Sequence, residues 1–120
     1  MRHDLDLVRK ILIAIEDMPP DPAWESLHLD GYDDSVVGEH VRILAEAGFI
    51  EMQNMSNFAE SIYCPTALTW QGGLLLDSIR NDTVWAKVKA FAQTVGQASF
   101  PILLERLADY ASTLNIPPSP

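Results

Sequence analysis

Apolar residues recur at three- and four-residue spacing in five segments of this chain, which is the pattern of helices with one buried face. In the first segment, Leu5, Val8, Ile11, Leu12 and Ile15 share one face. The predicted helices cover Asp4 to about Asp17, Asp33 or Asp34 to Ala47, Trp70 to about Arg80, Val84 to about Val95, and a last segment that opens at Ser99 or Pro101 and extends to Leu114.

Between the second and third helical segments, the pattern predicts two strands and a connecting loop. The first strand begins at Phe49, and the second returns from Ile62 to Leu68. The residues from Asn54 to Ser61 are polar and predict the loop between the strands. Pro65 has no backbone N–H to donate, so we expect the second strand to lie at a sheet edge or to be irregular there.

The segment from Asp21 to Tyr32 predicts a loop that contains one short edge strand. Leu27 to Leu29 form this strand, and the Asp30–Gly31 turn signal stops it. The segment has no room for an additional helix.

Glycine and threonine mark the two ends of the predicted hairpin. Gly48 directly follows the second helix, where glycine is the favoured residue. Thr69 is a candidate N-cap for the third helix. Gly72 and Gly73 lower the helix propensity of its first turn, so we expect glycine there to permit a close approach of this helix to the hairpin.

The order of elements from Gly31 to Gln71 is that of the last helix and the wing of a winged-helix domain. We therefore predict an α+β, mostly α fold, with three helices and a small antiparallel sheet over residues 1–81. Residues 82–116 form a C-terminal helical hairpin, and residues 117–120 form a tail. The hairpin is too small to be a domain alone, so it packs on the first part of the chain or forms a homodimer contact.

Composition indicates a folded protein of a reducing compartment. The 120 residues suit one domain, and 48% hydrophobic with 21% charged residues argues against disorder. A single cysteine excludes an internal disulfide. The N-terminus lacks a signal-peptide pattern, and the apolar run from Ile11 to Ile15 is too short to span a bilayer. We expect a cytoplasmic protein without a membrane partner.

The formal net charge of −9 lies entirely on the first half of the chain. Residues 1–60 contain 13 Asp and Glu against 4 Lys and Arg, whereas residues 61–120 contain 4 of each. Proteins that bind DNA gain affinity when Lys and Arg replace the counterions of phosphate. The half that carries the predicted wing therefore repels phosphate on average.

No catalytic, cofactor or metal motif is visible. Cys64 has no base nearby in sequence, and the histidines lack partners at metal-binding spacing. We interpret His40 as a partly buried, hydrogen-bonded histidine at the seam between the second helix and the hairpin. Asp33 and Asp34 are interpreted as helix caps. The aromatic residues interpreted mostly as core are Trp24, Trp70, Trp85, Phe91, Phe100 and Tyr110.

Two kinds of partner remain open for the second helix and the wing. A helix that reads bases presents Arg, Lys, Asn or Gln, but the outer face here offers Arg42 among several carboxylates. The same carboxylates suit a basic protein partner. The candidate DNA-binding residues are Arg42, Asn54, Asn57, Lys87 and Lys89, and the candidate protein-contacting residues are Asp33, Asp34, Glu39 and Glu46.

Four blocks of sequence resemble a known family. These are MRHDLDLVRKILIAIEDM, GYDDSVVGEHVRILAEAGFIE, LTWQGGLLLDSIRNDTVWAKVK and LLERLADYASTL. In this order they are similar to the bacterial and bacteriophage family called domain of unknown function 2513. The resemblance implies a winged-helix-like fold and a bacterial, prophage or mobile-element setting, and it implies no activity. The function is then either a regulator-type DNA-binding module or an acidic interaction module, such as a phage-encoded modulator or nucleic-acid mimic.

Overall fold

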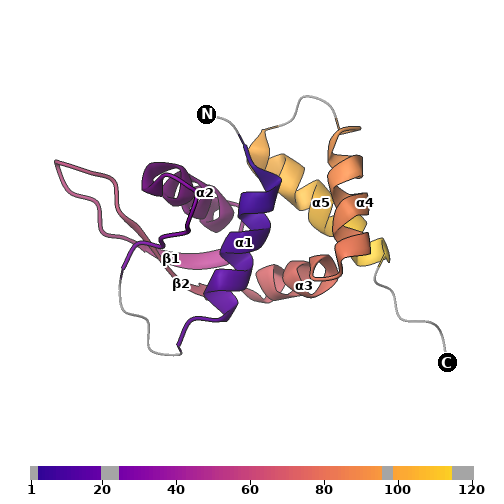
Figure 1. Ribbon diagram of the computed structural model, residues 1–120, viewed down its shortest axis with the longest axis horizontal. Helices are drawn as coiled ribbons and strands as arrows, with labels where there is room; N and C mark the ends of the chain where they lie inside the picture. The colour runs from indigo at the N-terminus through magenta and orange to yellow at the C-terminus, as the bar shows by residue number, and fades with distance from the viewer. Residues whose placement is uncertain (1–2, 20–24, 96–98, 115–120) are drawn as a thin grey trace.

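The computed structural model of the chain describes residues 3–19, 25–95 and 99–114. Within these residues, five helices lie around a two-stranded antiparallel sheet, which confirms the predicted α+β, mostly α class (Figure 1). In chain order the elements are α1 (Leu5–Glu16), α2 (Asp34–Glu46), β1 (Ile50–Asn54), β2 (Tyr63–Leu68), α3 (Trp70–Ile79), α4 (Asp82–Ala92) and α5 (Phe100–Leu114).

Side-chain caps explain where three of the helices begin. Asp4, Thr69 and Asn81 each accept a hydrogen bond from a backbone N–H two or three residues later. This satisfies a donor that the first helical turn leaves without an intrahelical partner. The predicted starts of α1 and α3 are confirmed. The helix α4 begins at Asp82 rather than Val84, because Asn81 is the capping residue.

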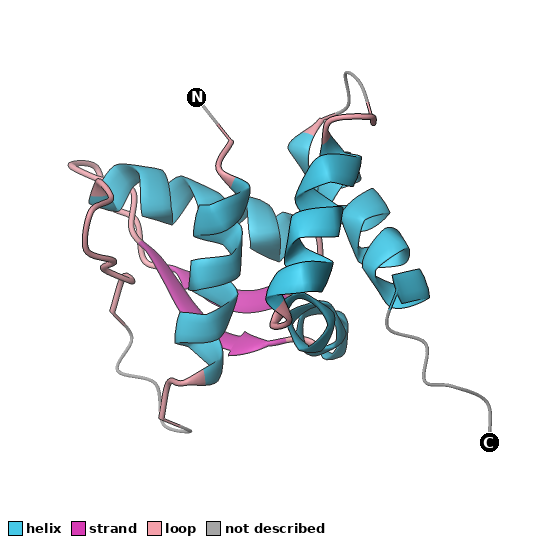
Figure 2. Cartoon of the chain, turned by 45° about the vertical axis from the view of Figure 1, so that its right-hand side comes forward, coloured by secondary structure: helices cyan, strands magenta, loops and turns pink. Residues whose placement is uncertain are grey.

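One hydrophobic core joins all five helices and the hairpin. The helix α1 lies across the sheet, and α4 and α5 stand side by side next to α3 (Figures 1 and 2). Val88 of α4 and Leu104 and Leu107 of α5 are buried in the same core as Leu12 of α1 and Leu44 of α2. The C-terminal helices therefore pack on the first part of the chain.

The sheet register contains the irregularity that Pro65 predicts. Ile50 pairs with Leu68 at one end of the ladder, and Met52 pairs with Pro65 after a register shift. The shift leaves Thr66 as an extra residue in β2. Proline has no N–H to donate to a neighbouring strand, so a bulge beside Pro65 costs the sheet no hydrogen bond from this residue.

The predicted short strand at Leu27–Leu29 is wrong. These residues are loop, and the sheet has only β1 and β2 among the residues that the structure describes. The carbonyl of Leu29 accepts a hydrogen bond from the backbone N–H of Tyr32 at 3.2 Å and so closes a turn. The two leucines are half-buried against the core. The alternating pattern therefore arises because a loop packs these two leucines against the core, and no neighbouring strand is involved.

The end of α2 and the start of α3 meet at one junction. Gly48 follows α2 with φ +88°, as its position after the helix predicts. The Thr69 N–H donates to the carbonyl of Phe49 at 3.1 Å, and the Thr69 hydroxyl donates to the carbonyl of Gly48 at 2.6 Å. A Cβ atom on Gly72 would lie 1.8 Å from the same Phe49 oxygen. The predicted close approach of this helix to the hairpin is confirmed.

We predict that Gly72→Ala lowers the free energy of unfolding by about 1–3 kcal/mol, because the added methyl group meets a backbone atom that cannot rotate away. Gly73→Ala is the matched control. A Cβ on Gly73 meets nothing within 4 Å, so this change raises stability by up to about 1 kcal/mol through helix propensity. Urea denaturation of both variants measures the difference, and equal stabilities would contradict the role given to Gly72.

Candidate interaction surfaces

The outer face of α2 carries one guanidinium between two carboxylates. Arg42 donates from Nε to Glu39 at 3.0 Å and also forms an ion pair with Glu46. These partners lie three residues before and four residues after it, the spacing of neighbours on a helix surface. The hydrogen bond and charge of Glu39 raise the pKa of Arg42, and the hydrogen bond from Arg42 lowers the pKa of Glu39. The cation on this face is therefore already neutralised within the helix.

The two aspartates at the start of α2 differ in their contacts. Asp33 occupies the N-cap position, but its side chain makes no capping hydrogen bond. The carboxylate of Asp34 contacts Nδ1 of His28 at 2.8 Å. We interpreted both residues as caps. Asp33 does occupy the N-cap position, but its side chain does not cap the helix, and Asp34 is the first residue of α2. Together with Glu39 and Glu46, these residues place four carboxylates against one guanidinium on α2 and its N-cap.

The loop between β1 and β2, which we name the wing loop only after its predicted role, uses its asparagines to shape its own backbone. The side-chain oxygen of Asn54 accepts from the backbone N–H two residues later at 3.0 Å. That of Asn57 accepts from the N–H groups two and three residues later at 2.8 and 3.0 Å. Such bonds stabilise turns, and they present the fully exposed ring of Phe58. No Lys or Arg occurs from Asn54 to Leu68.

The remaining candidate cations lie on α4, apart from the wing. Lys89 pairs with Asp6 at 3.1 Å and lies 5.6 Å from the ring centroid of Trp85. Lys87 is exposed and forms no ion pair within the described residues. The helix α4 lies beyond α1 as seen from the wing loop (Figure 1). The structure therefore does not bring these lysines together with Arg42.

His40 joins α2 to the start of α1. Its side chain is fully buried, and Nδ1 contacts the carbonyl of Val36 at 2.8 Å. A carbonyl oxygen can only accept, so Nδ1 carries the proton and Nε2 accepts from the backbone N–H of Asp4 at 3.1 Å. The predicted hydrogen bonding of His40 is confirmed, but its side chain is fully rather than partly buried. Its hydrogen-bonded seam is with α1 rather than with the hairpin.

Cys64 is a buried residue of β2. Burial raises the pKa of its thiol, and the charge of Glu25 acts in the same direction. A raised pKa disfavours the thiolate that a nucleophile needs. Among the described residues, no group of three or more His, Cys, Asp or Glu side chains could bind a metal ion. In that same part of the chain, no helix is both long and apolar enough to cross a bilayer.

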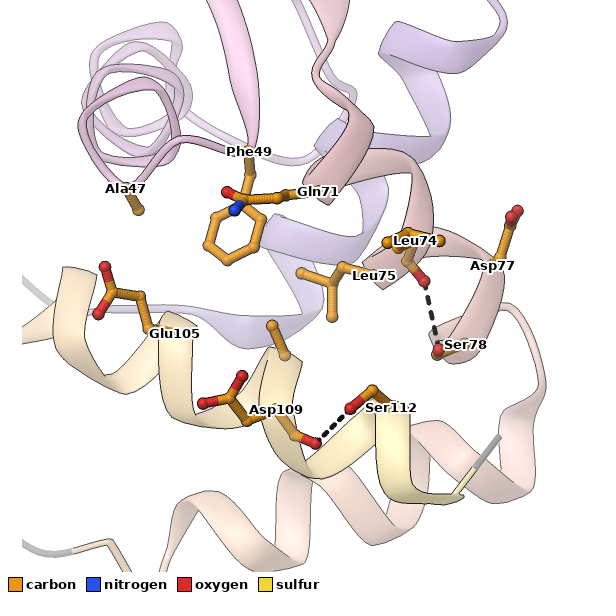
Figure 3. Close-up of a pocket in the computed structure, with 11 residues that line it drawn as sticks. Ala47, Phe49, Gln71, Leu74, Leu75, Asp77, Ser78, Glu105, Asp109 and Ser112 are labelled. Atoms are coloured by element: carbon orange, nitrogen blue, oxygen red, sulfur yellow. Dashed lines mark hydrogen bonds between the residues drawn. The ribbon is translucent and has the colours of Figure 1, made fainter. Parts of the chain in front are cut away.

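A groove between α3 and α5 is the feature that the sequence did not reveal. It has a volume of about 580 Å³, and its lining includes the nearly buried side chains of Phe49 and Leu75 and the exposed side chain of Leu74 (Figure 3). Three carboxylates also line it, from Asp77 on α3 and from Glu105 and Asp109 on α5. The other lining residues are Ala47, Gln71, Leu74, Ser78, Ala108 and Ser112.

Two large apolar side chains of α3 are exposed, and one of them, Leu74, lines the groove. Trp70 is 81% exposed and Leu74 is 52% exposed. The prediction that Trp70 belongs to the core is wrong, because it stands at the first position of α3 and points outward there. Trp85 and Phe100 are buried as predicted, and Phe91 and Tyr110 stack at the edge of the core. Trp24 lies outside the described residues.

Comparison with known proteins places this sequence in a family. The chain belongs to the family described as "Hypothetical protein (DUF2513)", whose model matches residues 2–98. An uncharacterized protein of Haemophilus influenzae is 37% identical over 117 residues, which cover 95% of each chain. No solved structure matches the chain. The resemblance seen in the sequence is confirmed. Neither the description of the family nor that of the Haemophilus influenzae protein names an activity.

We predict that two histidines titrate in opposite directions from the ordinary value of 6.5. A hydrogen bond to Asp34, followed by the charges of Asp34 and Asp30, raises the pKa of His28. Burial lowers the pKa of His3. NMR titration of the imidazole protons measures both. Asp34→Asn should lower the pKa of His28 and leave that of His3 unchanged.

The sign of the stability effect follows from these shifts. Because the pKa of His28 is raised in the folded state, its contact with Asp34 contributes fully below the ordinary histidine value. The contribution falls as the pH rises through the raised value. Identical titration midpoints for the two histidines would contradict the contacts described.

Proposed function

We propose that this protein is a non-catalytic binding module whose partner is a protein with a basic surface. The observation that carries the proposal is the pairing of Arg42 with Glu39 and Glu46. The outer face of α2 then presents an acidic surface, with Asp33 and Asp34 at its start. Carboxylates arranged on one face favour basic partners through charge complementarity and long-range attraction. Binding occurs through this face, which we name the α2 face, and involves no chemical step.

DNA binding is the second candidate function. The order α2, β1, wing loop, β2 and α3 agrees with the recognition helix and wing of a winged-helix domain, and this likeness is the observation that favours it. Three features oppose it. The α2 guanidinium is paired, the wing loop lacks Lys and Arg, and residues 25–33 contain no helix that could cross a DNA backbone before α2.

We expect the protein not to shift a short labelled DNA duplex, even at low salt. Binding to phosphate requires unpaired Lys and Arg, and its affinity falls steeply as salt rises. An electrophoretic shift assay over a range of salt concentrations tests this. A shift that weakens with salt and is reduced by Arg42→Ala or Lys87→Ala would overturn the proposal in favour of DNA binding.

Charge reversal of the α2 face should remove a protein partner. The triple variant carries Asp33→Lys, Asp34→Lys and Glu39→Lys. We expect its affinity for the partner to fall by at least about tenfold relative to the wild type, because like charges then face each other. Affinity capture with graded salt elution and mass spectrometry measures retention.

A second triple variant supplies the matched control. Asp17, Glu25 and Glu60 are exposed and lie outside α2, and each is replaced by Lys. This control has the same total charge as the α2-face variant. Retention of the partner by the control and loss by the α2-face variant supports the proposal. Equal loss of the partner by both variants would contradict the proposal, because binding would then depend on net charge and not on the α2 face.

A further inference from the structure

We propose that the groove between α3 and α5 is a second docking surface, which binds a basic amphipathic helix of a partner protein. This goes beyond the α2 face, because the groove is lined by other elements and by other carboxylates. Helices commonly bind in apolar grooves through side chains at three- and four-residue spacing.

The apolar surface extends from the groove onto exposed helix. Figure 3 shows the Phe49 ring directed toward the space between α3 and α5, with Leu75 beside it. On α3, Leu74 follows Trp70 by four residues, so both side chains share one face. Both are exposed. Tryptophan and leucine side chains left exposed beside a groove are typical of surfaces that bind proteins.

The charges of the groove have no partners of their own. Within residues 3–19, 25–95 and 99–114, Asp77, Glu105 and Asp109 form no ion pair. Glu39 and Glu46 on α2, in contrast, share the guanidinium of Arg42. No Lys or Arg lines the groove. Charge complementarity therefore selects a basic occupant over an acidic one and excludes the phosphate backbone of DNA.

The arrangement of these groups selects a helix with an apolar face. Glu105 and Asp109 lie four residues apart on the α5 side, and Asp77 lies on the α3 side (Figure 3). The nearly buried side chains of Phe49 and Leu75 lie between the two sides, and the exposed Leu74 also lines the groove. A helix that places leucines onto this surface would direct lysine or arginine toward the carboxylates of Glu105 and Asp109 on α5.

A synthetic peptide tests the proposal directly. The probe is a labelled helix-forming peptide with leucine at three- and four-residue spacing and lysine on the other face. Its controls are a scrambled peptide of the same composition and a peptide with glutamate in place of lysine. Fluorescence anisotropy should show saturable binding of the first peptide, at least about tenfold weaker binding of the scrambled peptide, and none of the acidic peptide.

Variants of the protein locate the binding. Trp70→Ala and Leu74→Glu change exposed side chains, so circular dichroism and thermal unfolding should remain close to wild type while affinity falls at least about tenfold. Glu105→Lys with Asp109→Lys should weaken binding similarly. The matched control is Asp17→Lys with Glu60→Lys, which makes the same change in charge at exposed residues outside the groove and the α2 face and should leave peptide affinity unchanged.

Several outcomes would overturn the proposal. One is equal weakening by the groove charge variant and by the control with Asp17→Lys and Glu60→Lys, which would mean non-specific attraction. Another is tight binding of the scrambled peptide, and a third is the absence of binding. A protein dimer in analytical ultracentrifugation that dissociates on Leu74→Glu would assign the groove to a second copy of the chain. Binding of a partner to the α2 face does not involve Trp70 or Leu74. A negative result for the groove therefore does not contradict the proposed function, which the charge-reversal experiment tests separately.

Discussion

The contact between Gly72 and the carbonyl of Phe49 is the constraint on which the rest of this structure depends. A side chain at position 72 would occupy the place of that oxygen, so the absence of a Cβ sets how closely α3 approaches the hairpin. Thr69 fixes the same junction through hydrogen bonds to Gly48 and Phe49. The position of Phe49 then determines where its ring meets the space between α3 and α5. The fold and the proposed groove therefore share one geometric origin.

Local signals in the sequence predicted most of the elements. The cap at Thr69 and the glycine after α2 are short-range features, and they marked helix ends correctly. The pattern at Leu27–Leu29 misled, because alternating burial requires a strand only when another strand is available to pair with it. Such pairing is a property of the folded chain and is invisible in three residues.

The outer face of α2 could be predicted from the sequence, whereas the groove between α3 and α5 could not, because only the first depends on residues close together in the chain. The neighbours of Arg42 lie within one helical turn or so, and the helical period alone places Glu39 and Glu46 beside it. The groove brings α3 together with α5, two helices separated by the whole of α4. The exposure of Trp70 was equally hidden, because α3 contains the run Leu74 to Leu76 and its apolar residues do not single out one face. Tertiary packing decided which of them faced solvent.

The contacts of α1 have a consequence for how the protein forms as it leaves the ribosome. Asp6 accepts a hydrogen bond from Trp85 at 3.0 Å, and Arg9 pairs with Asp82 at 2.8 Å. The helix α1 is synthesised before α4 and finds partners on it, across 79 and 73 residues. Contacts of such long range form late and expose apolar surface until they do. Asp6 and Arg9 therefore lack these partners until translation has delivered α4, whereas α1 can already pack on α2, β2 and α3.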